Sequence, residues 1–185
     1  MKKIAFIGTG VMGKSMVMNL MKKGFEVTIY ARNRQKVEDL ISNGAIFCDT
    51  IESCVKNKDA IITIVGYPKD VEEVYFSQKG IINSASKNSY LIDMTTTSPK
   101  LSVQIYNSAK QKGLKALDAP VSGGDMGAKN GTLSIMVGGD KEDFEACKEI
   151  FQAMGTTILH EGKAGNGQHT KMANQIAIAG LMAGI

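Results

Sequence analysis

Lys171 is the side chain of this sequence that stands in the best place to do chemistry. It lies within residues 162–175, where a glycine-rich loop leads into a helical pattern. Gly162 and Gly167 have the spacing of a P-loop, but glutamine and histidine stand where that loop places a lysine and a serine or threonine. The stretch is therefore not a phosphate loop of this kind. The question is which upstream residues come together near Lys171.

A serine followed by two glycines offers a place for a small anion. Ser122, Gly123 and Gly124 come shortly after a predicted strand at residues 114–118. Backbone N–H groups in such a turn form a nest that suits a small carboxylate, with the Ser122 hydroxyl as an extra donor. The alternative interpretation is an ordinary glycine turn. The spacing is not that of the GxSxG elbow of a hydrolase, and no suitable triad histidine is evident.

A glycine motif near the N-terminus predicts a dinucleotide site. This GxGxxG motif follows an apolar strand at residues 3–7 and opens a helix that runs through Met21. Its glycines allow a tight turn, a close approach of the backbone to a pyrophosphate and close packing of helix on strand, and the helix start favours an anion. An ordinary glycine turn is the weaker interpretation, because strand and helix flank the motif. The predicted cofactor-binding residues here are Gly8, Thr9, Gly10, Val11, Met12 and Gly13.

The end of the second predicted strand, residues 26–30, favours NADP over NAD. NAD-binding domains commonly place an acidic residue here to bind the ribose hydroxyl. This sequence continues instead with Ala31, Arg32, Asn33 and Arg34. A guanidinium can pair with a 2′-phosphate, which an acid would repel. We therefore predict NADP as the cofactor with Arg32 as a contact, and NAD as the alternative. The competing interpretation is that Arg32 and Arg34 are solvated residues that open the next helix.

Two later turns leave predicted strands at the same edge of the sheet. One follows residues 60–65 and the other follows residues 90–93. Ligands of open α/β sheets bind at the carboxyl ends of the strands, so both turns are expected to touch the cofactor. The second turn also predicts a helix start, with Thr97 or Ser98 as N-cap and Pro99 at the first helical position. The predicted cofactor contacts from the two turns are Val65, Gly66, Tyr67 and Thr95.

The elements that must position these residues alternate in the manner of an α/β protein. Further strands are predicted at residues 26–30, 45–47, 60–65, 90–93, 114–118, 132–137 and 156–160. Further helices are predicted at residues 35–42, from residue 50, and at residues 71–76, 100–112 and 142–154. Such alternation indicates a parallel sheet. We predict a Rossmann-type α/β fold with a doubly wound, mostly parallel sheet, followed by the start of a long helix.

Composition narrows the class of protein. The chain of 185 residues is 43% hydrophobic and 22% charged, which suits one globular domain with a sizeable core. The net charge of +4 comes from 22 basic and 18 acidic residues without long runs of one sign. This argues against a nucleic-acid partner and mildly favours an anionic small ligand.

Cysteine, histidine and apolar patterns bear on location and metals. Cys48, Cys54 and Cys147 have no disulfide or zinc spacing, and His160 and His169 have no metal-ligand spacing. We therefore predict no metal and a reducing, cytoplasmic setting. No secretory signal is recognisable at the start. The apolar residues 176–185 fall short of the ~20 that a membrane span needs, so no membrane partner is expected.

Four blocks of residues together resemble the β-hydroxyacid dehydrogenase family, which includes 3-hydroxyisobutyrate dehydrogenase and 2-hydroxy-3-oxopropionate reductase. The blocks are the GxGxxG motif, residues 93–99, residues 118–124, and residues 162–174 with the spacing GxxGxGxxxK. The resemblance covers essentially the whole chain. Its last two blocks are far more specific than the first.

The resemblance implies a role for each block. Lys171 would be the catalytic residue, with Asn174 and Ser122 beside it. The substrate carboxylate would be held by Ser122, Gly123, Gly124 and Lys171. The family has asparagines just after its lysine, whereas here Asn174 lies three positions on and Gln175 four positions on. Both positions lie near the lysine on a helix, so either amide could be its partner.

The resemblance also implies the reaction and the division of the chain. The reaction would be reversible hydride transfer between NADP(H), or NAD(H), and a small 3-hydroxy acid or semialdehyde, such as 3-hydroxyisobutyrate or 2-hydroxy-3-oxopropionate. Residues 1–163 would form the dinucleotide-binding domain and residues 164–185 the first part of an interdomain helix. The family's helical second domain is missing from this sequence. The expected partners are a small carboxylate substrate and, for the full-length protein, further copies in a homo-oligomer.

A second hypothesis comes from a different class of protein. It is a non-catalytic NADP-binding module that serves as an interaction or regulatory domain. It predicts cofactor binding without turnover, and it leaves the presence of Lys171 unexplained.

Overall fold

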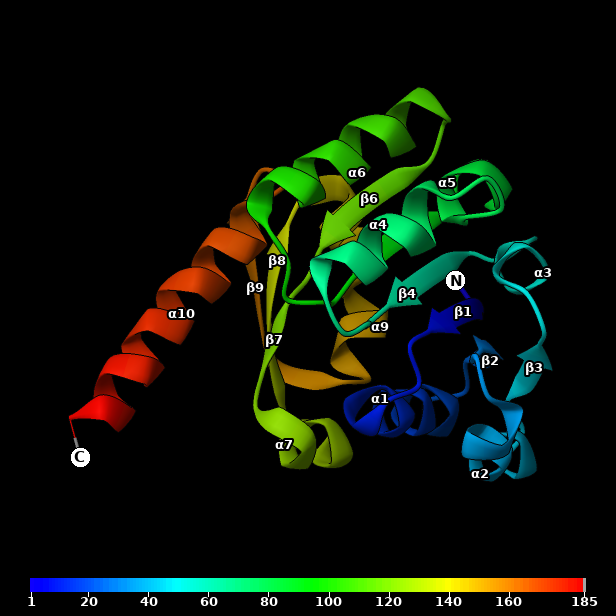
Figure 1. Ribbon diagram of the computed structural model, residues 1–185, viewed down its shortest axis with the longest axis horizontal. Helices are drawn as coiled ribbons and strands as arrows, with labels where there is room; N and C mark the ends of the chain where they lie inside the picture. Colours follow the sequence, from blue (N-terminus) through cyan, green and yellow to red (C-terminus); the bar gives the residue numbers. More distant parts are fainter. Residues whose placement is uncertain (185) are drawn as a thin grey trace.

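The computed structural model describes residues 1–184 and shows one central sheet with helices on both faces (Figure 1). The strands are β1 (Lys3–Ile7), β2 (Glu26–Tyr30), β3 (Ile46–Cys48), β4 (Ala60–Thr63), β5 (Tyr90–Asp93), β6 (Lys115–Asp118), β7 (Val121–Ser122), β8 (Leu133–Gly138) and β9 (Gly155–Gly162). The helices are α1 (Val11–Lys22), the short 3₁₀ helix η1 (Arg34–Val37), α2 (Glu38–Ser42), α3 (Ile51–Val55), α4 (Pro68–Phe76), α5 (Ile81–Ser84), α6 (Pro99–Gln111), α7 (Gly124–Asn130), α8 (Lys141–Ala146), α9 (Lys148–Gln152) and α10 (Asn166–Ala183).

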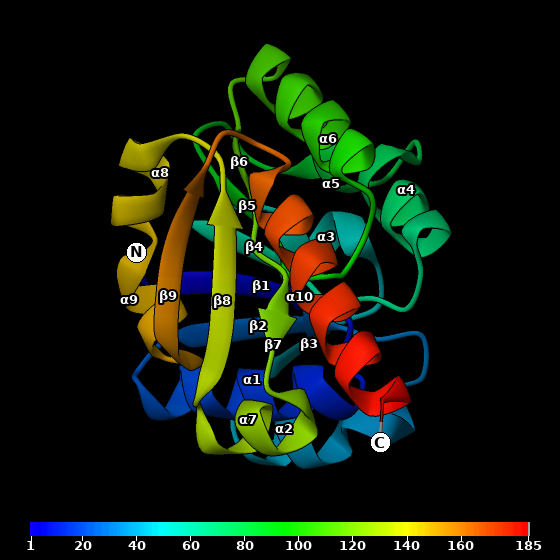
Figure 2. The ribbon, with the colours of Figure 1, turned by 90° about the vertical axis from the view of Figure 1, so that its left-hand side faces the viewer.

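The strand order is that of a doubly wound fold. Neighbours follow the order β3-β2-β1-β4-β5-β6-β8-β7, and β9 pairs with β8. The pairs from β3 to β6 are parallel, whereas β8 runs antiparallel to β6 and β7 (Figure 2). The sheet is therefore mostly parallel, and the predicted Rossmann-type fold class is confirmed.

The central strands are apolar because both of their faces are covered. Along β1, Ile4 and Phe6 enter one hydrophobic core, whereas Ala5 and Ile7 enter a second core. Successive side chains of a strand point to opposite faces, so the two cores lie on the two sides of the sheet. The carboxyl ends of β1, β2 and β4 are left for the loops that build a site.

Several elements differ from those that the sequence predicted. The predicted helix at 142–154 is interrupted at Cys147, giving α8 and α9, and the predicted helix at 35–42 begins as η1. Helices α5 and α7 and the two-residue strand β7 were not predicted, because they are too short to show a clear period. Of the two N-caps expected for α6, Ser98 is the observed one, and its side chain accepts from the N–H of Leu101 at 3.2 Å.

Helix α10 crosses the end of the sheet and then extends away from it (Figure 1). Its buried residues lie in the first two turns, and they are Gly167, Gln168 and Lys171. Its large apolar side chains exposed to solvent are Met172, Ile176, Ile178, Leu181 and Met182. The last residue of the predicted segment 164–185, Ile185, lies outside the described residues. None of the helices formed by residues 1–184 has the length and apolar character needed to cross a membrane.

Candidate active site

Gly8 forms the tight turn between β1 and α1. Its φ of +103° lies in a region that residues with a side chain rarely adopt. A Cβ atom here would also overlap the backbone carbonyl of Ile64, just after β4. The turn therefore requires glycine.

Helix α1 presents an uncapped N-terminus beside this turn. Gly10 is its N-cap, no side chain caps it, and its first turn has no acidic residue. The unpaired N–H groups and the helix dipole favour an anion here. A Cβ atom on Gly10 would meet nothing within 4 Å, so a phosphate can approach the backbone closely. The residues present therefore fit the pyrophosphate of a dinucleotide.

A cleft of about 630 Å³ lies at the carboxyl ends of β1, β2 and β4, where Ile7, Tyr30 and Ile64 line it. Its volume is within the range of small-molecule and cofactor sites. The cleft thus occupies the edge of the sheet that the sequence predicted. The members of the predicted cofactor set that line it are Gly8, Thr9, Gly10, Val11, Met12, Gly13, Arg32, Val65 and Gly66.

The part of the cleft beyond β2 carries two exposed cationic residues, Arg32 and Lys36. Arg34 is engaged elsewhere. Its Nε lies 3.4 Å from Oε1 of Glu38, and its guanidinium lies 5.4 Å from the ring centre of Phe47. Arg32 is therefore the arginine that the structure places at the cleft. Lys36 was not predicted as a cleft residue. The only signal for it in the sequence was a further positive charge four positions after Arg32.

The turns after β4 and β5 carry Tyr67 and Thr95, whose contacts with the cofactor stay predictions. Tyr67 is 74% exposed and outside the cleft lining, because it precedes α4 and its N–H donates to Oδ2 of Asp70 at 2.9 Å. Thr95 is buried, and its Oγ1 accepts from the N–H of Val65 at 3.0 Å. The Thr95 hydroxyl therefore holds a residue that lines the cleft and does not itself line it.

The predicted carboxylate nest lies between β7 and α7. Ser122 ends β7 and is half-buried, whereas Gly123 and Gly124 are exposed. Both glycines have positive φ angles, 130° and 62°. Successive N–H groups in such a turn can converge on an anion.

Lys171 lies on the inner face of α10 and is 7% exposed. Burial lowers the pKa of its ammonium. One turn on, Nδ2 of Asn174 lies 3.5 Å from Oγ of Ser122 and 3.3 Å from Oε1 of Gln175. Asn174 is half-buried and Gln175 is exposed. Of the two amides that the sequence left open, the structure thus places Asn174 toward the nest and Gln175 toward solvent.

The start of α10 is held by two buried polar side chains that the sequence did not single out as site residues. Oδ1 of Asp118 accepts from the N–H of Gly165 at 2.7 Å, and Oδ2 accepts from the N–H of Gln168 at 3.0 Å. The Gln168 carboxamide accepts from the N–H of Thr97 at 3.0 Å and donates to the carbonyl of Thr95 at 2.7 Å. We call Asp118, Gln168 and the backbone groups they bind the helix seat. The one feature of the sequence that could have indicated this seat is an aspartate at the end of a buried strand.

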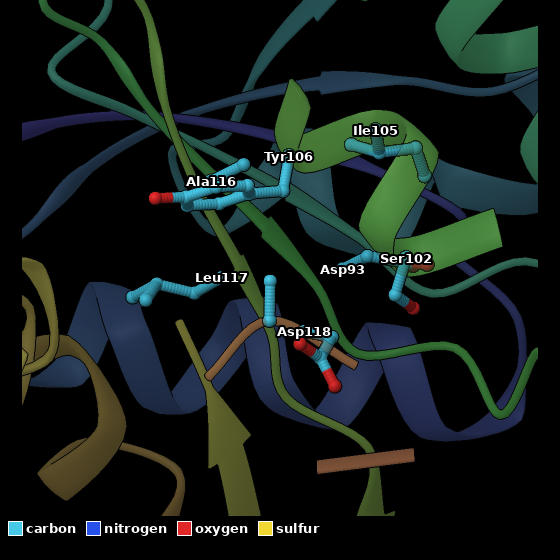
Figure 3. Close-up of a pocket in the computed structure, with 8 residues that line it drawn as sticks. Asp93, Ser102, Ile105, Tyr106, Ala116, Leu117 and Asp118 are labelled. Carbon is cyan, nitrogen blue, oxygen red and sulfur yellow. The ribbon is translucent and has the colours of Figure 1, made fainter. Parts of the chain in front are cut away.

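A small cavity lies between β5, β6 and α6, next to the helix seat (Figure 3). Its volume is about 10 Å³, room for roughly one water molecule, so it cannot hold a substrate. Asp93, Ser102 and Asp118 line it. Within residues 1–184, Oδ2 of Asp93 and Oγ of Ser102 make no hydrogen bond. Burial raises the pKa of Asp93 to about 6.

The histidines lie apart from this constellation. Nε2 of His160 lies 2.8 Å from the carbonyl oxygen of Gly139, and its ring stacks on Phe144. His169 is exposed on α10. In the described part of the chain, no group of three histidine, cysteine or acidic residues could hold a metal ion.

A doubly wound sheet with a glycine turn, an uncapped helix start and a cleft at the carboxyl strand ends defines a dinucleotide-binding domain. The chain belongs to the family described as the NAD binding domain of 6-phosphogluconate dehydrogenase, which matches residues 3–162. The expected resemblance to hydroxyacid dehydrogenases is confirmed by the relatives.

An uncharacterized oxidoreductase, YkwC, from Bacillus subtilis is 58% identical over 184 residues, which span 100% of this chain and 64% of that protein. An NAD-dependent L-serine dehydrogenase from Pseudomonas aeruginosa is 37% identical, over 100% of this chain and 62% of that protein. A solved structure of Mycobacterium tuberculosis 3-hydroxyisobutyrate dehydrogenase with L-serine has a TM-score of 0.92 at 31% identity, over 97% of this chain and 60% of that chain. The chain thus spans less than two thirds of each of these relatives.

Proposed function

We propose that the full-length protein catalyses reversible hydride transfer between NADP(H) and a small 3-hydroxy acid or its semialdehyde. The observation that carries the proposal is the inner face of α10. It presents a buried lysine, Lys171, and an amide, Asn174, whose Nδ2 lies 3.5 Å from Oγ of Ser122. Ser122 ends β7, a strand of the same sheet whose edge holds the dinucleotide cleft.

Each side chain has a role that its chemistry suits. Lys171 gives a proton to the carbonyl oxygen in one direction and takes it from the hydroxyl in the other. Burial lowers its pKa, which brings its proton affinity closer to the working pH. Ser122 and the N–H groups of Gly123 and Gly124 bind the carboxylate. Asn174 orients the substrate between Lys171 and Ser122.

The cofactor proposal rests on the two ends of the cleft. The residues of the glycine loop hold the pyrophosphate, and Arg32 with Lys36 binds the 2′-phosphate of NADP. NAD stays the alternative, since the L-serine dehydrogenase relative is named as NAD-dependent. When bound in the cleft, a nicotinamide supplies or accepts the hydride.

The division of the chain supports the same function. We propose residues 1–163 as the dinucleotide-binding domain and residues 164–185 as the first part of an interdomain helix. The exposed apolar side chains of α10 favour this, since a helix face of this kind needs covering. We further propose that the full-length protein forms a homo-oligomer in a cytoplasmic setting.

The substrate is a small acid in which the reacting carbon is attached to the carbon next to the carboxylate. The relatives' names favour 3-hydroxyisobutyrate and L-serine as first candidates, and 2-hydroxy-3-oxopropionate belongs to the same chemical class. Each has a hydroxyl or carbonyl beta to a carboxylate. This spacing suits the separate places of the lysine and the carboxylate nest.

A substrate panel tests the function. Full-length protein is mixed with NADPH carrying deuterium at C4 and with each semialdehyde in turn, and the product is analysed by mass spectrometry. We expect deuterium in the hydroxy acid product for at least one member of the panel. Binding of NADPH without transfer to any member would favour the non-catalytic module instead.

A further inference from the structure

We propose that Asp118 and Gln168 are positioning residues that set the place of Lys171 by fixing the first turn of α10 against the ends of β5 and β6. The inference rests on the proposed function, because it takes Lys171 as the residue that transfers the proton. It concerns two side chains that reach Lys171 only through the helix that carries it.

Asp118 binds the N-terminal end of α10 from the end of β6. It is 4% exposed, and its two carboxylate oxygens accept from two N–H groups of the first turn, at 2.7 and 3.0 Å. A carboxylate at a helix N-terminus is stabilised by the unpaired N–H groups and by the helix dipole. Since Asp118 ends β6, the helix start is fixed to a strand of the central sheet.

Gln168 binds the first turn of α10 to the segment that follows β5. It is 0% exposed, and its carboxamide binds one N–H and one carbonyl of residues 95–97, which follow β5. An amide supplies the one acceptor and one donor that these backbone groups require. An unpaired buried donor or acceptor is unfavourable, so these two hydrogen bonds hold the turn and the helix together.

Glycine allows the helix to come this close. A Cβ atom on Gly167 would overlap the backbone carbonyl of Met136 in β8 and lie 2.8 Å from the carbonyl oxygen of Asp118. The first turn of α10 is thus in direct contact with β6 and β8. This close packing opposes a sideways shift of the turn.

The helix seat connects the lysine to the cofactor cleft. Lys171 lies three residues after Gln168, hence on the same face one turn further along α10. Thr95, whose carbonyl binds Gln168, also accepts through its hydroxyl from the N–H of Val65, which lines the cleft. A shift of Gln168 therefore moves Lys171 relative to the cofactor. Among the described residues no hydrogen bond holds the Lys171 ammonium itself.

The first test replaces the carboxamide by an apolar side chain of similar length. In the full-length protein, Gln168→Met should lower kcat by roughly 100-fold, because a displacement of about 1 Å has effects of this size. NADPH affinity should stay within about twofold, since the cleft lining is unchanged. The split between kcat and cofactor binding separates a positioning role from general damage.

The second test makes the positioning depend on pH. In Gln168→Glu, a protonated carboxyl keeps one acceptor and one donor, whereas an ionised carboxylate only accepts and faces the carbonyl of Thr95. Burial raises the pKa of such a carboxyl, so the intact pair of bonds exists at low pH and is lost as the pH rises. The kcat of Gln168→Glu relative to wild type should fall by roughly tenfold or more between pH 5 and pH 9.

Apart from residue 168, the titratable groups in and next to the seat are the same in both proteins. They are Asp118 from β6, Asp93 from β5 and Lys171 from α10, so the ratio to wild type at each pH largely cancels their own titration. The matched control is His169→Glu, which adds the same carboxyl one residue away on the exposed side of α10. Its kcat ratio should stay constant across the pH range.

The outcomes separate this inference from the proposed function. If Lys171→Met is inactive while Gln168→Met and Gln168→Glu turn over like wild type at every pH, the positioning role is wrong and the function stands. If Lys171→Met keeps its turnover, the proton-transfer role of Lys171 is wrong, and absence of deuterium transfer to every semialdehyde would show that the function is wrong. If Gln168→Met fails to fold, the pH series of Gln168→Glu decides, and a flat kcat ratio there overturns the inference.

Discussion

The cofactor cleft and the helix seat are built in opposite ways. The cleft uses backbone groups, a turn at Gly8 and an uncapped helix start at Gly10, and its lining includes exposed residues such as Arg32. The seat uses buried side chains, because Asp118 and Gln168 are 4% and 0% exposed and bind backbone groups of distant segments. The difference suggests that the cleft is open to receive a large anion, while the seat is closed so that one lysine keeps a fixed place.

The largest expected effect comes from replacing Lys171, the lysine that the helix seat positions. In the full-length protein, Lys171→Ala should lower kcat by about 10²–10⁴-fold, since it removes the group that transfers the proton. NADPH binding, measured by fluorescence titration, should be unchanged, because Lys171 does not line the cleft. Lys163→Ala, at an exposed lysine before α10, is the control and should turn over normally.

A pair of glycine variants sharpens the account of the cofactor side. Gly8→Ala should destabilise the protein by about 2–4 kcal/mol, because of strain at positive φ and overlap with Ile64. Gly10→Ala should fold with near-normal stability, since nothing lies within 4 Å of the added methyl group. It should nevertheless weaken NADPH binding about tenfold or more, because the methyl group blocks the close approach of a phosphate. Equal stability of the two variants in urea titrations would contradict the structure of this turn.

The raised pKa of Asp93, which lines the small cavity next to the helix seat, predicts how stability depends on pH. Burial raises this pKa to about 6, above the ordinary value of about 3.9 expected in the unfolded chain. The folded protein thus binds the proton more tightly, so this stabilising contribution is present at low pH and is lost as the pH rises from about 4 to above 6. Asp93→Asn keeps the acceptor that binds Thr63 and Thr95 but carries no charge.

The stability of Asp93→Asn relative to wild type should therefore rise by roughly 2–3 kcal/mol between pH 4 and pH 8. Urea unfolding of both proteins at each pH measures it. Asp49→Asn, at an exposed aspartate, is the control and should show no such trend. A trend of the opposite sign would mean that the Asp93 carboxylate is stabilised in the fold.

The smallest effect concerns the choice between NADP and NAD. Arg32→Ala should reduce the preference for NADPH over NADH by roughly tenfold, as expected for the loss of one charge-assisted contact. Arg34→Ala is the matched control, because Arg34 is engaged by Glu38 and Phe47. If Arg34→Ala changes the preference as much as Arg32→Ala, then the cleft does not distinguish the two arginines.

The same contrast explains what the sequence could predict. Strands β1, β2 and β5 were predicted with their observed bounds, and the glycine loop was recognised, because each depends on residues close together in the chain. Gln168 was noted only as a departure from a phosphate loop. Its two partners lie 71 and 73 residues away, a distance at which no local spacing can indicate a contact. The sequence likewise did not indicate that the Thr95 hydroxyl accepts from the N–H of Val65, 30 residues away.

The central claim is that the lysine, the carboxylate nest and the cofactor cleft converge on one substrate. The most direct measurement is a crystal structure of the full-length protein with NADP⁺ and a 3-hydroxy acid. We expect the carboxylate on the N–H groups of Gly123 and Gly124 with the Ser122 hydroxyl, and the substrate hydroxyl within hydrogen-bond distance of Nζ of Lys171. A ternary complex in which the hydroxyl lies against another residue, with Lys171 out of reach, would contradict the account.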